Sequence, residues 1–75
     1  MVDECRVRYI TLGQQHVHSI GGKTVDKDCV VKVTATRERV MEVFEGKFHG
    51  DYSQEEFDTQ DIMQYFPKGI VEVVI

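Results

Sequence analysis

The apolar residues of this chain change their spacing at Thr36. In segment 29–35, CVVKVTA, apolar and polar positions alternate with the period of two that is typical of a strand with one buried face. In segment 37–45, Val40 and Phe44 fall on one side of a helix, and most of the charged residues fall on the other. The change of period predicts a strand followed by a helix over 36–45, with Thr36 as its N-cap.

Three further segments carry strand or helix signals. Segments 6–12, RVRYITL, and 69–75, GIVEVVI, are rich in β-branched and aromatic residues, as strands are. Ser53 and Glu56 have the spacing of a capping box, which predicts short helical turns before Pro67. The aromatic and apolar residues that we expect to pack from these turns onto the sheet are Phe57, Ile62, Tyr65 and Phe66.

The order of these elements is β-β-α-(α)-β, which predicts a single α+β domain over residues 1–75. We expect a small antiparallel sheet of at least three strands with the main helix packed on one face. A chain of 75 residues buries only about 60% of the surface of its unfolded form, so its margin of stability is narrow.

Composition and the N-terminus limit the cellular setting. Asp3 and Glu4 occupy positions where a signal peptide carries positive charge, and no apolar run reaches the roughly 18 residues of a membrane span. Two cysteines, Cys5 and Cys29, are too few for a disulfide framework, although a single bridge between them stays open. We therefore expect a soluble, cytoplasmic protein.

Charge is divided unevenly along the chain. Residues 1–41 contain seven Lys or Arg and five Asp or Glu, whereas residues 42–75 contain two and eight. The C-terminal half is therefore acidic, and the calculated pI of the chain is about 5.2. Because a nucleic-acid-binding protein normally carries a basic stripe, we expect no direct nucleic-acid binding and no membrane binding; an acidic half instead suits a basic protein surface.

Polar residues are concentrated in segment 13–29, GQQHVHSIGGKTVDKDC, around the hairpin signal Gly21-Gly22. If the segment is extended, His16 and His18 point to the same side. Such a face could bind a small ligand, which is our alternative hypothesis for the function. Its candidate ligand-binding residues are Gln14, His16, His18, Lys23, Asp26 and Asp28.

The loop length at the hairpin decides which side chains lie beside the histidines. A loop of two or four residues brings Lys27 and Cys29 to that face, whereas a loop of three residues brings Asp26 and Asp28. A lysine beside the histidines disfavours a cation, so we predict no metal and no cofactor. If a metal binds, the ligands expected are His16, His18 and Cys29. No spacing in the chain matches a catalytic motif, so we predict no catalytic residue and interpret the protein as a non-enzyme.

The C-terminal strand, 69–75, carries only one charge, at Glu72. A strand of this composition needs a cover, because an open edge exposes unpaired backbone groups. It could lie inside the sheet beside segment 6–12, or it could pair with a second copy across a twofold axis. Because a domain this small gains most from the extra burial, we expect a homodimer or a larger symmetric assembly. The candidate interface residues are Ile70, Val71, Val73 and Ile75.

Nearly the whole chain also resembles small open reading frames of phages, prophages and some bacteria. The resemblance rests on YITLGQQHVHSIGGKTVDKDCVV, residues 9–31, and on the later MQYFPKG, residues 63–69. It implies a phage-type accessory protein that acts in the host cytoplasm by binding a host protein and inhibiting or redirecting it. Together with size and charge, it leads us to expect a small interaction module that binds a protein partner.

Overall fold

A computed structural model describes residues 5–13 and 18–75 of the chain. It has an α+β fold, as the sequence predicts, and no helix among these residues is long and apolar enough to cross a membrane. The elements in chain order are β1 (Arg6–Thr11), β2 (His18–Ile20), β3 (Lys23–Val25), β4 (Val30–Ala35), α1 (Arg37–Phe44), β5 (Gly50–Ser53), α2 (Gln54–Thr59), the 3₁₀ helix η1 (Ile62–Tyr65) and β6 (Ile70–Glu72).

The main sheet has four strands in the order β5-β1-β4-β6, and β2 and β3 form a separate hairpin. β1 pairs antiparallel with both β4 and β5, whereas β6 runs parallel to β4. The predicted antiparallel sheet of at least three strands is present in β5-β1-β4, and the C-terminal strand β6 adds a parallel pair to it. The chain passes through α1, β5, α2 and η1 between β4 and β6, and a connection of this length allows two neighbouring strands to run in the same direction.

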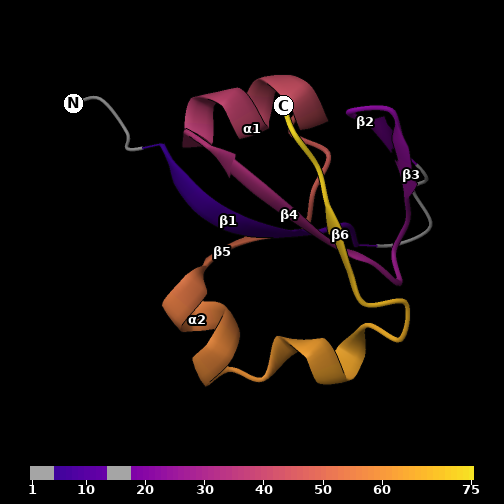
Figure 1. Ribbon diagram of the computed structural model, residues 1–75, viewed down its shortest axis with the longest axis vertical. Coiled ribbons are helices and arrows are strands. Elements are labelled where there is room, and N and C mark those ends of the chain that lie inside the picture. The colour runs from indigo at the N-terminus through magenta and orange to yellow at the C-terminus, as the bar shows by residue number, and fades with distance from the viewer. Residues whose placement is uncertain (1–4, 14–17) are drawn as a thin grey trace.

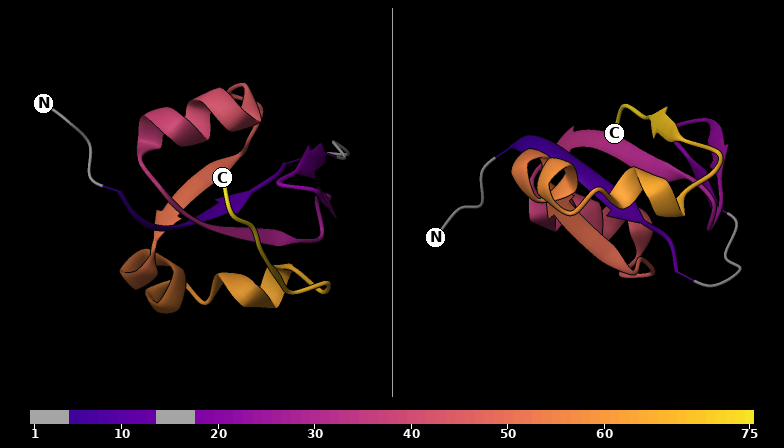
Figure 2. Two further views of the ribbon diagram at one scale, coloured as in Figure 1. Left: turned by 45° about the horizontal axis from the view of Figure 1, so that its top comes forward. Right: turned by 90° about the horizontal axis from the view of Figure 1, so that it is seen from below.

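Two helical layers cover the two faces of this sheet (Figures 1 and 2). On one face Ile10 and Val31 pack with Val40 and Phe44 of α1 in the larger core cluster. On the opposite face α2 and η1 contribute Phe57 and Ile62 to a smaller cluster that contains Tyr9 and Val30. The rings of Tyr9 and Phe57 stack there with centroids 4.0 Å apart. Alternation along β1 and β4 therefore supplies both cores, because successive side chains point to opposite faces.

Local signals place both α-helices. The Thr36 hydroxyl accepts a hydrogen bond from the Arg39 amide, which confirms the predicted N-cap of α1. The predicted capping box of α2 is also confirmed: the Glu56 amide donates to Ser53 Oγ, and the Ser53 amide donates to the Glu56 carboxylate. These contacts satisfy amides at the first turn of each helix that have no partner within the helix.

The hairpin β2–β3 closes through a two-residue turn, Gly21-Gly22, with Ile20 opposite Lys23. Both glycines have positive φ, 56° and 80°, as tight hairpin turns of this length require. The tip of the hairpin lies against the C-terminal segment. A Cβ atom at Gly21 would lie 2.5 Å from Val73 Cγ1 and 2.8 Å from the Val74 carbonyl oxygen, so only glycine fits there.

β6 is an edge strand beside β4, and the hairpin tip covers its outer side. Lys23 Nζ donates to the Glu72 carbonyl oxygen at 2.7 Å, on the side facing away from β4. This contact and the packing of Gly21 supply a cover for the strand within one chain. Of the four predicted interface residues, Val73 is buried in the chain's own core, whereas Ile70 is 44% exposed. Val71 and Ile75 are half-buried.

A buried ion pair fixes β5 to the rest of the sheet. The Arg8 side chain, 3% exposed, donates from Nη1 to Asp51 Oδ2 at 3.0 Å, and the Asp51 side chain is 5% exposed. Arg8 Nε also donates to the Ala35 carbonyl oxygen at 3.0 Å. Removing one partner of a buried ion pair typically costs about 3–5 kcal/mol.

We predict that Asp51→Ala lowers the free energy of unfolding by about 3 kcal/mol, because the Arg8 guanidinium loses its buried ion pair with the Asp51 carboxylate. The double variant Arg8→Met/Asp51→Leu should recover most of this loss, since no charge is then left buried. Urea denaturation of the three proteins measures the difference.

Glu42→Ala is the matched control, because its ion pair with Arg39 lies on the exposed side of α1. Its cost should be below about 0.5 kcal/mol, as for other exposed pairs. A loss for Asp51→Ala no larger than that of the control would contradict a structural role for the buried pair.

Candidate functional site

An open pocket lies between the main sheet and the α2–η1 layer. Its volume is about 370 Å³, which falls within the range of about 300–1,000 Å³ that is usual for small-ligand sites. The end of β1, the start of β5 and the segment through η1 form its walls. The lining residues are Thr11, His49, Tyr52, Gln60, Ile62, Tyr65 and Phe66.

The sheet wall of the pocket depends on a glycine. Gly50 pairs with Thr11 across β1 and β5, and the Tyr52 ring lies directly over it. A Cβ atom at position 50 would stand 2.6 Å from this ring, so a larger residue would displace Tyr52 from the pocket. His49 is held next to the same strand end, since its amide donates to the Thr11 carbonyl oxygen at 2.7 Å.

The Thr11 hydroxyl is buried without a hydrogen-bond partner. Among the buried side-chain nitrogen and oxygen atoms of residues 5–13 and 19–75, only Thr11 Oγ1 has none. Thr11 shares its face of β1 with Tyr9, so its side chain points to the α2–η1 side, where the pocket lies. A buried polar group without a partner typically costs about 1–3 kcal/mol, and such a group is expected where a ligand supplies the missing partner.

The other walls are mainly aromatic. Tyr52 is half-buried, Phe66 packs at the margin of the smaller core, and Tyr65 is 70% exposed at the open side. The prediction that Tyr65 packs on the sheet is therefore wrong. Ile62 is the buried residue of η1, and Tyr65 stands at the open side of the pocket. Gln60 and His49 add hydrogen-bonding groups to these apolar walls.

The predicted hairpin site is only partly described. Gln14 and His16 lie outside the described residues, and of His18 only the backbone, in β2, is described. Two of the described candidates make contacts within the chain, as Lys23 binds the Glu72 carbonyl and Asp26 accepts from Lys68 Nζ at 2.6 Å. These two side chains help to hold the fold together.

The described residues contain no cluster of metal ligands and no disulfide bond. Within the described part of the chain, no three His, Cys, Asp or Glu residues group together in a way that could hold a metal ion. Cys29 is buried and Cys5 is exposed, and both are free thiols. The two-residue hairpin turn places Val25 opposite His18, which is one of the two arrangements that the sequence favours.

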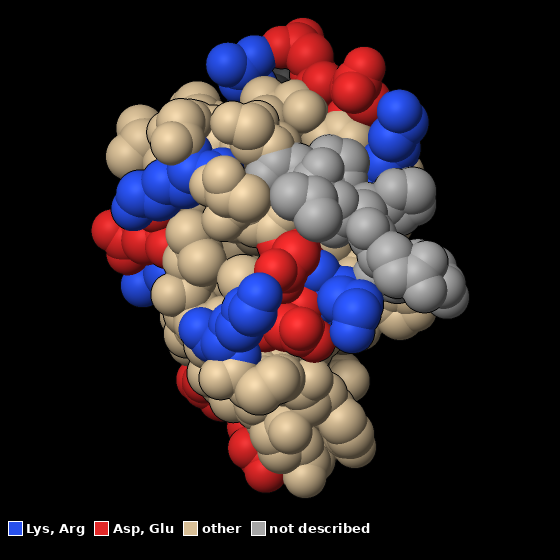
Figure 3. Space-filling model, turned by 90° about the vertical axis from the view of Figure 1, so that its right-hand side faces the viewer, with Lys and Arg blue, Asp and Glu red and all other residues tan. Residues whose placement is uncertain are grey.

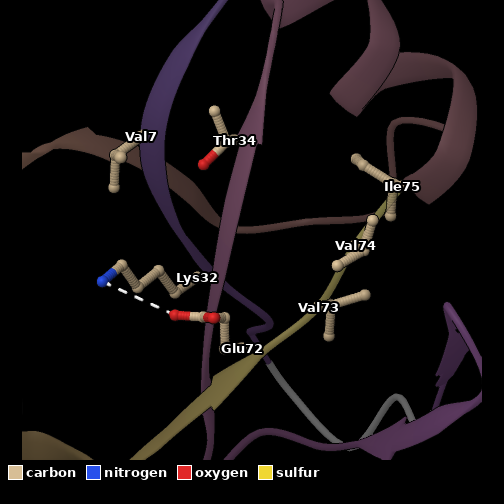
Figure 4. A pocket seen from close by; sticks show the side chains of 7 residues that line it. All are labelled: Val7, Lys32, Thr34, Glu72, Val73, Val74 and Ile75. Atoms are coloured by element: carbon tan, nitrogen blue, oxygen red, sulfur yellow. Dashed lines mark ion pairs between the residues drawn. The ribbon is translucent and has the colours of Figure 1, made fainter.

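A second, smaller pocket of about 230 Å³ lies along the C-terminal segment (Figure 4). Lys32 and Glu72 form an ion pair across one end of it, with Nζ and Oε2 3.7 Å apart. Val73, Val74 and Ile75 supply the other end. Its charged groups already compensate each other, so this pocket offers less to a polar ligand than the pocket at Thr11.

The sequence contains little that would have marked the pocket at Thr11. Its residues come from positions 11, 49–52 and 60–66, which are far apart in the sequence. Segment 49–53, HGDYS, lacks the composition typical of a strand. The only local indication is a glycine two residues before Tyr52, which is compatible with many turns. Comparisons with known proteins add no assignment, because no family model, curated protein or solved structure matches this chain.

We predict that Thr11→Val raises the free energy of unfolding by about 1 kcal/mol. Valine keeps the shape and the strand preference of threonine but removes the buried hydroxyl that lacks a partner. Urea denaturation measures the change, with Thr34→Val on an exposed position of β4 as the control. A destabilisation of Thr11→Val by more than about 1 kcal/mol would show that the hydroxyl is already satisfied.

The ion pair of Asp26 with Lys68 makes the stability of the fold depend on pH. The hydrogen bond from Lys68 is the main cause that lowers the pKa of Asp26, and the Asp28 amide adds to it. The ionised form is thus favoured in the folded state, so this contribution is present above the ordinary aspartate pKa and is lost as pH falls through and below about 4. The same pair raises the pKa of Lys68, so its contribution is lost only at strongly alkaline pH.

Asp26→Asn should therefore be less stable than the wild type at neutral pH, and the two proteins should converge as the pH is lowered below about 4. Chemical denaturation at a series of pH values gives the comparison. A stability difference that stays constant down to pH 2 would exclude this ion pair as its source.

Proposed function

We propose that the protein is a small interaction module that binds a basic protein surface through the α2–η1 layer, residues 54–66. The observation that carries the proposal is the combination, in this one layer, of exposed acidic residues, exposed apolar residues and an open pocket. The resemblance to phage-type reading frames supports an accessory protein of the host cytoplasm that inhibits or redirects its partner.

All charged residues of the layer are acidic. Between Lys47 and Lys68 the chain has no Lys or Arg. Of the acids in this interval, Asp51 is neutralised inside the fold by Arg8. The remaining four are exposed and keep their charge at the surface: Glu55, Glu56, Asp58 and Asp61. Charges of one sign on one face steer a partner of opposite charge and raise its association rate.

The surface charge on the hairpin side of the molecule is more evenly mixed. Figure 3 shows Lys and Arg side chains next to Asp and Glu side chains on the hairpin side of the molecule. At the lower end of that view, where the α2–η1 layer lies, the same face shows acidic side chains without basic ones. The α2–η1 layer thus suits a basic partner better than the hairpin side does, including a surface that normally binds nucleic acid.

Apolar side chains on the layer supply contact area. Tyr65 is 70% exposed and Met63 is 36% exposed, both in η1 beside the pocket. Tyrosine and methionine are enriched in protein interfaces, where an aromatic anchor often carries much of the binding energy. Acidic residues around such an anchor would provide orientation and selectivity.

Two other hypotheses, ligand binding by the hairpin and a homodimer through β6, receive less support than partner binding through the α2–η1 layer. Ligand binding by the hairpin is less favoured because two of its candidate residues, Lys23 and Asp26, already form hydrogen bonds within the chain. A homodimer through β6 would require a second strand to replace the hairpin tip at Glu72 and Val74. Neither role is needed to account for the exposed features of the α2–η1 layer.

We predict that affinity capture from the cell that produces the protein yields one stoichiometric partner, and that neutralising the layer reduces its recovery about tenfold. The triple variant Glu55→Gln/Asp58→Asn/Asp61→Asn removes three exposed charges and leaves the capping residue Glu56 intact. Each exposed charge contributes modestly, and recovery should also fall at about 0.5 M salt because of screening.

The matched control is Glu38→Gln/Glu42→Gln/Glu45→Gln, which changes the net charge by the same amount at exposed positions on or just after α1. Partner recovery should be unchanged in this variant. Equal losses in the two triple variants would mean that net charge, and not the α2–η1 layer, governs binding. Absence of any stoichiometric partner would remove the proposal.

A further inference from the structure

We infer that the pocket at Thr11 is an acceptor site for a planar cation, a guanidinium group, such as an arginine side chain of the partner provides. The inference rests on the proposed function in one respect, because it names the group that a basic partner would insert between the sheet and the α2–η1 layer. The site itself is defined by its own residues and can be tested without the partner.

The pocket contains a buried hydrogen-bond acceptor. Thr11 is 3% exposed, and its hydroxyl oxygen has no donor among the described residues. A guanidinium carries five N–H donors and no acceptor, so it can supply the missing hydrogen bond to Oγ1. Gln60 also lines the pocket, and its side-chain carbonyl is a second possible acceptor for the same fork of donors.

Aromatic side chains form much of the pocket wall. Tyr52, Tyr65 and Phe66 line the pocket, and the faces of aromatic rings attract cations. A flat guanidinium stacks on a ring while its edges remain free to donate hydrogen bonds, which a lysine ammonium cannot do. The exposed position of Tyr65 leaves the open side accessible to an incoming side chain.

The charged residues of segment 49–66, which contains most of the lining residues, are acidic. No Lys or Arg lines the pocket, and Asp61 lies in the chain between the lining residues Gln60 and Ile62. The exposed acids of α2 precede this segment. A phosphate or carboxylate ligand would meet no countercharge here apart from a protonated His49, whereas a cation is attracted by the acidic layer.

The volume of about 370 Å³ admits the end of an arginine side chain together with part of its aliphatic stem. The stem would pack against Ile62 and Phe66, which are apolar. The pocket therefore provides an acceptor, a stacking surface, an apolar wall and a favourable potential for a single kind of group.

The test is an NMR titration of the ¹⁵N-labelled protein with three blocked tripeptides, in which the central residue of Gly-X-Gly is arginine, citrulline or lysine. Citrulline has nearly the shape of arginine without its charge, and lysine has the charge without the planar fork. The titration is run at pH 8, which keeps imidazole side chains neutral. The arginine peptide should give saturable shifts of the Thr11, Tyr52 and Gln60 amides, with an affinity at least fivefold above that of the other two.

Variants then locate the binding site. Thr11→Val should weaken the arginine peptide at least threefold while the protein stays folded, and Thr34→Val, on an exposed position of β4, should leave the affinity unchanged. Tyr65→Leu should also weaken binding, because the stacking surface is lost. Equal binding of citrulline, tighter binding of lysine, or shifts confined to residues outside the pocket would each overturn the inference.

The outcome is separable from that of the proposed function. Partner capture that depends on the α2 acids but is unaffected by Thr11→Val would leave the proposed function standing and refute the arginine site. Arginine-specific shifts at the pocket without any captured partner would establish a site for a free guanidinium compound, and the proposed function would fall.

Discussion

The buried contact of Arg8 with Asp51 joins three parts of the chain that are far apart in the sequence. Arg8 lies on β1, its Nε binds the carbonyl of Ala35 at the end of β4, and its guanidinium pairs with β5. β5 has only four residues, each of them half-buried, and it leads directly into the cap of α2. The position of the whole α2–η1 layer therefore depends on how firmly this short edge strand is held.

The two sides of the sheet are stabilised by unequal means. The α1 side has a continuous cluster of aliphatic residues from β1, β4, α1, the hairpin and the C-terminal segment. Among the described residues, the opposite side has four buried members, and the stacked rings of Tyr9 and Phe57 form its centre. The smaller core leaves room beside it for the open pocket, as well as exposed apolar residues in η1. Proteins commonly give up stability at the sites that bind their partners, and the unpaired Thr11 hydroxyl fits this pattern.

Much of the fold follows from short-range patterns. The period change at Thr36, the capping box at Ser53 and the Gly21-Gly22 turn each act over a few residues, and each is present in the structure. The strand β5 was missed because segment 49–53 has no strand composition; it pairs with β1 through backbone hydrogen bonds that almost any residue can make. The direction of β6 was missed because pairing direction depends on the path of the connecting chain and not on the strand's own residues.

Some features of the candidate site are likewise fixed by composition, whereas others depend on the folded structure. The acidity of residues 42–75 and the absence of Lys and Arg between 47 and 68 follow from composition, because each charge is present wherever the chain runs. The meeting of Thr11, Tyr52 and Tyr65 at one pocket, and the burial of the Thr11 hydroxyl there without a partner, arise only when the chain has folded. Burial and hydrogen-bond satisfaction depend on which distant segments come together, and three separate stretches of the chain must be in place before this pocket exists.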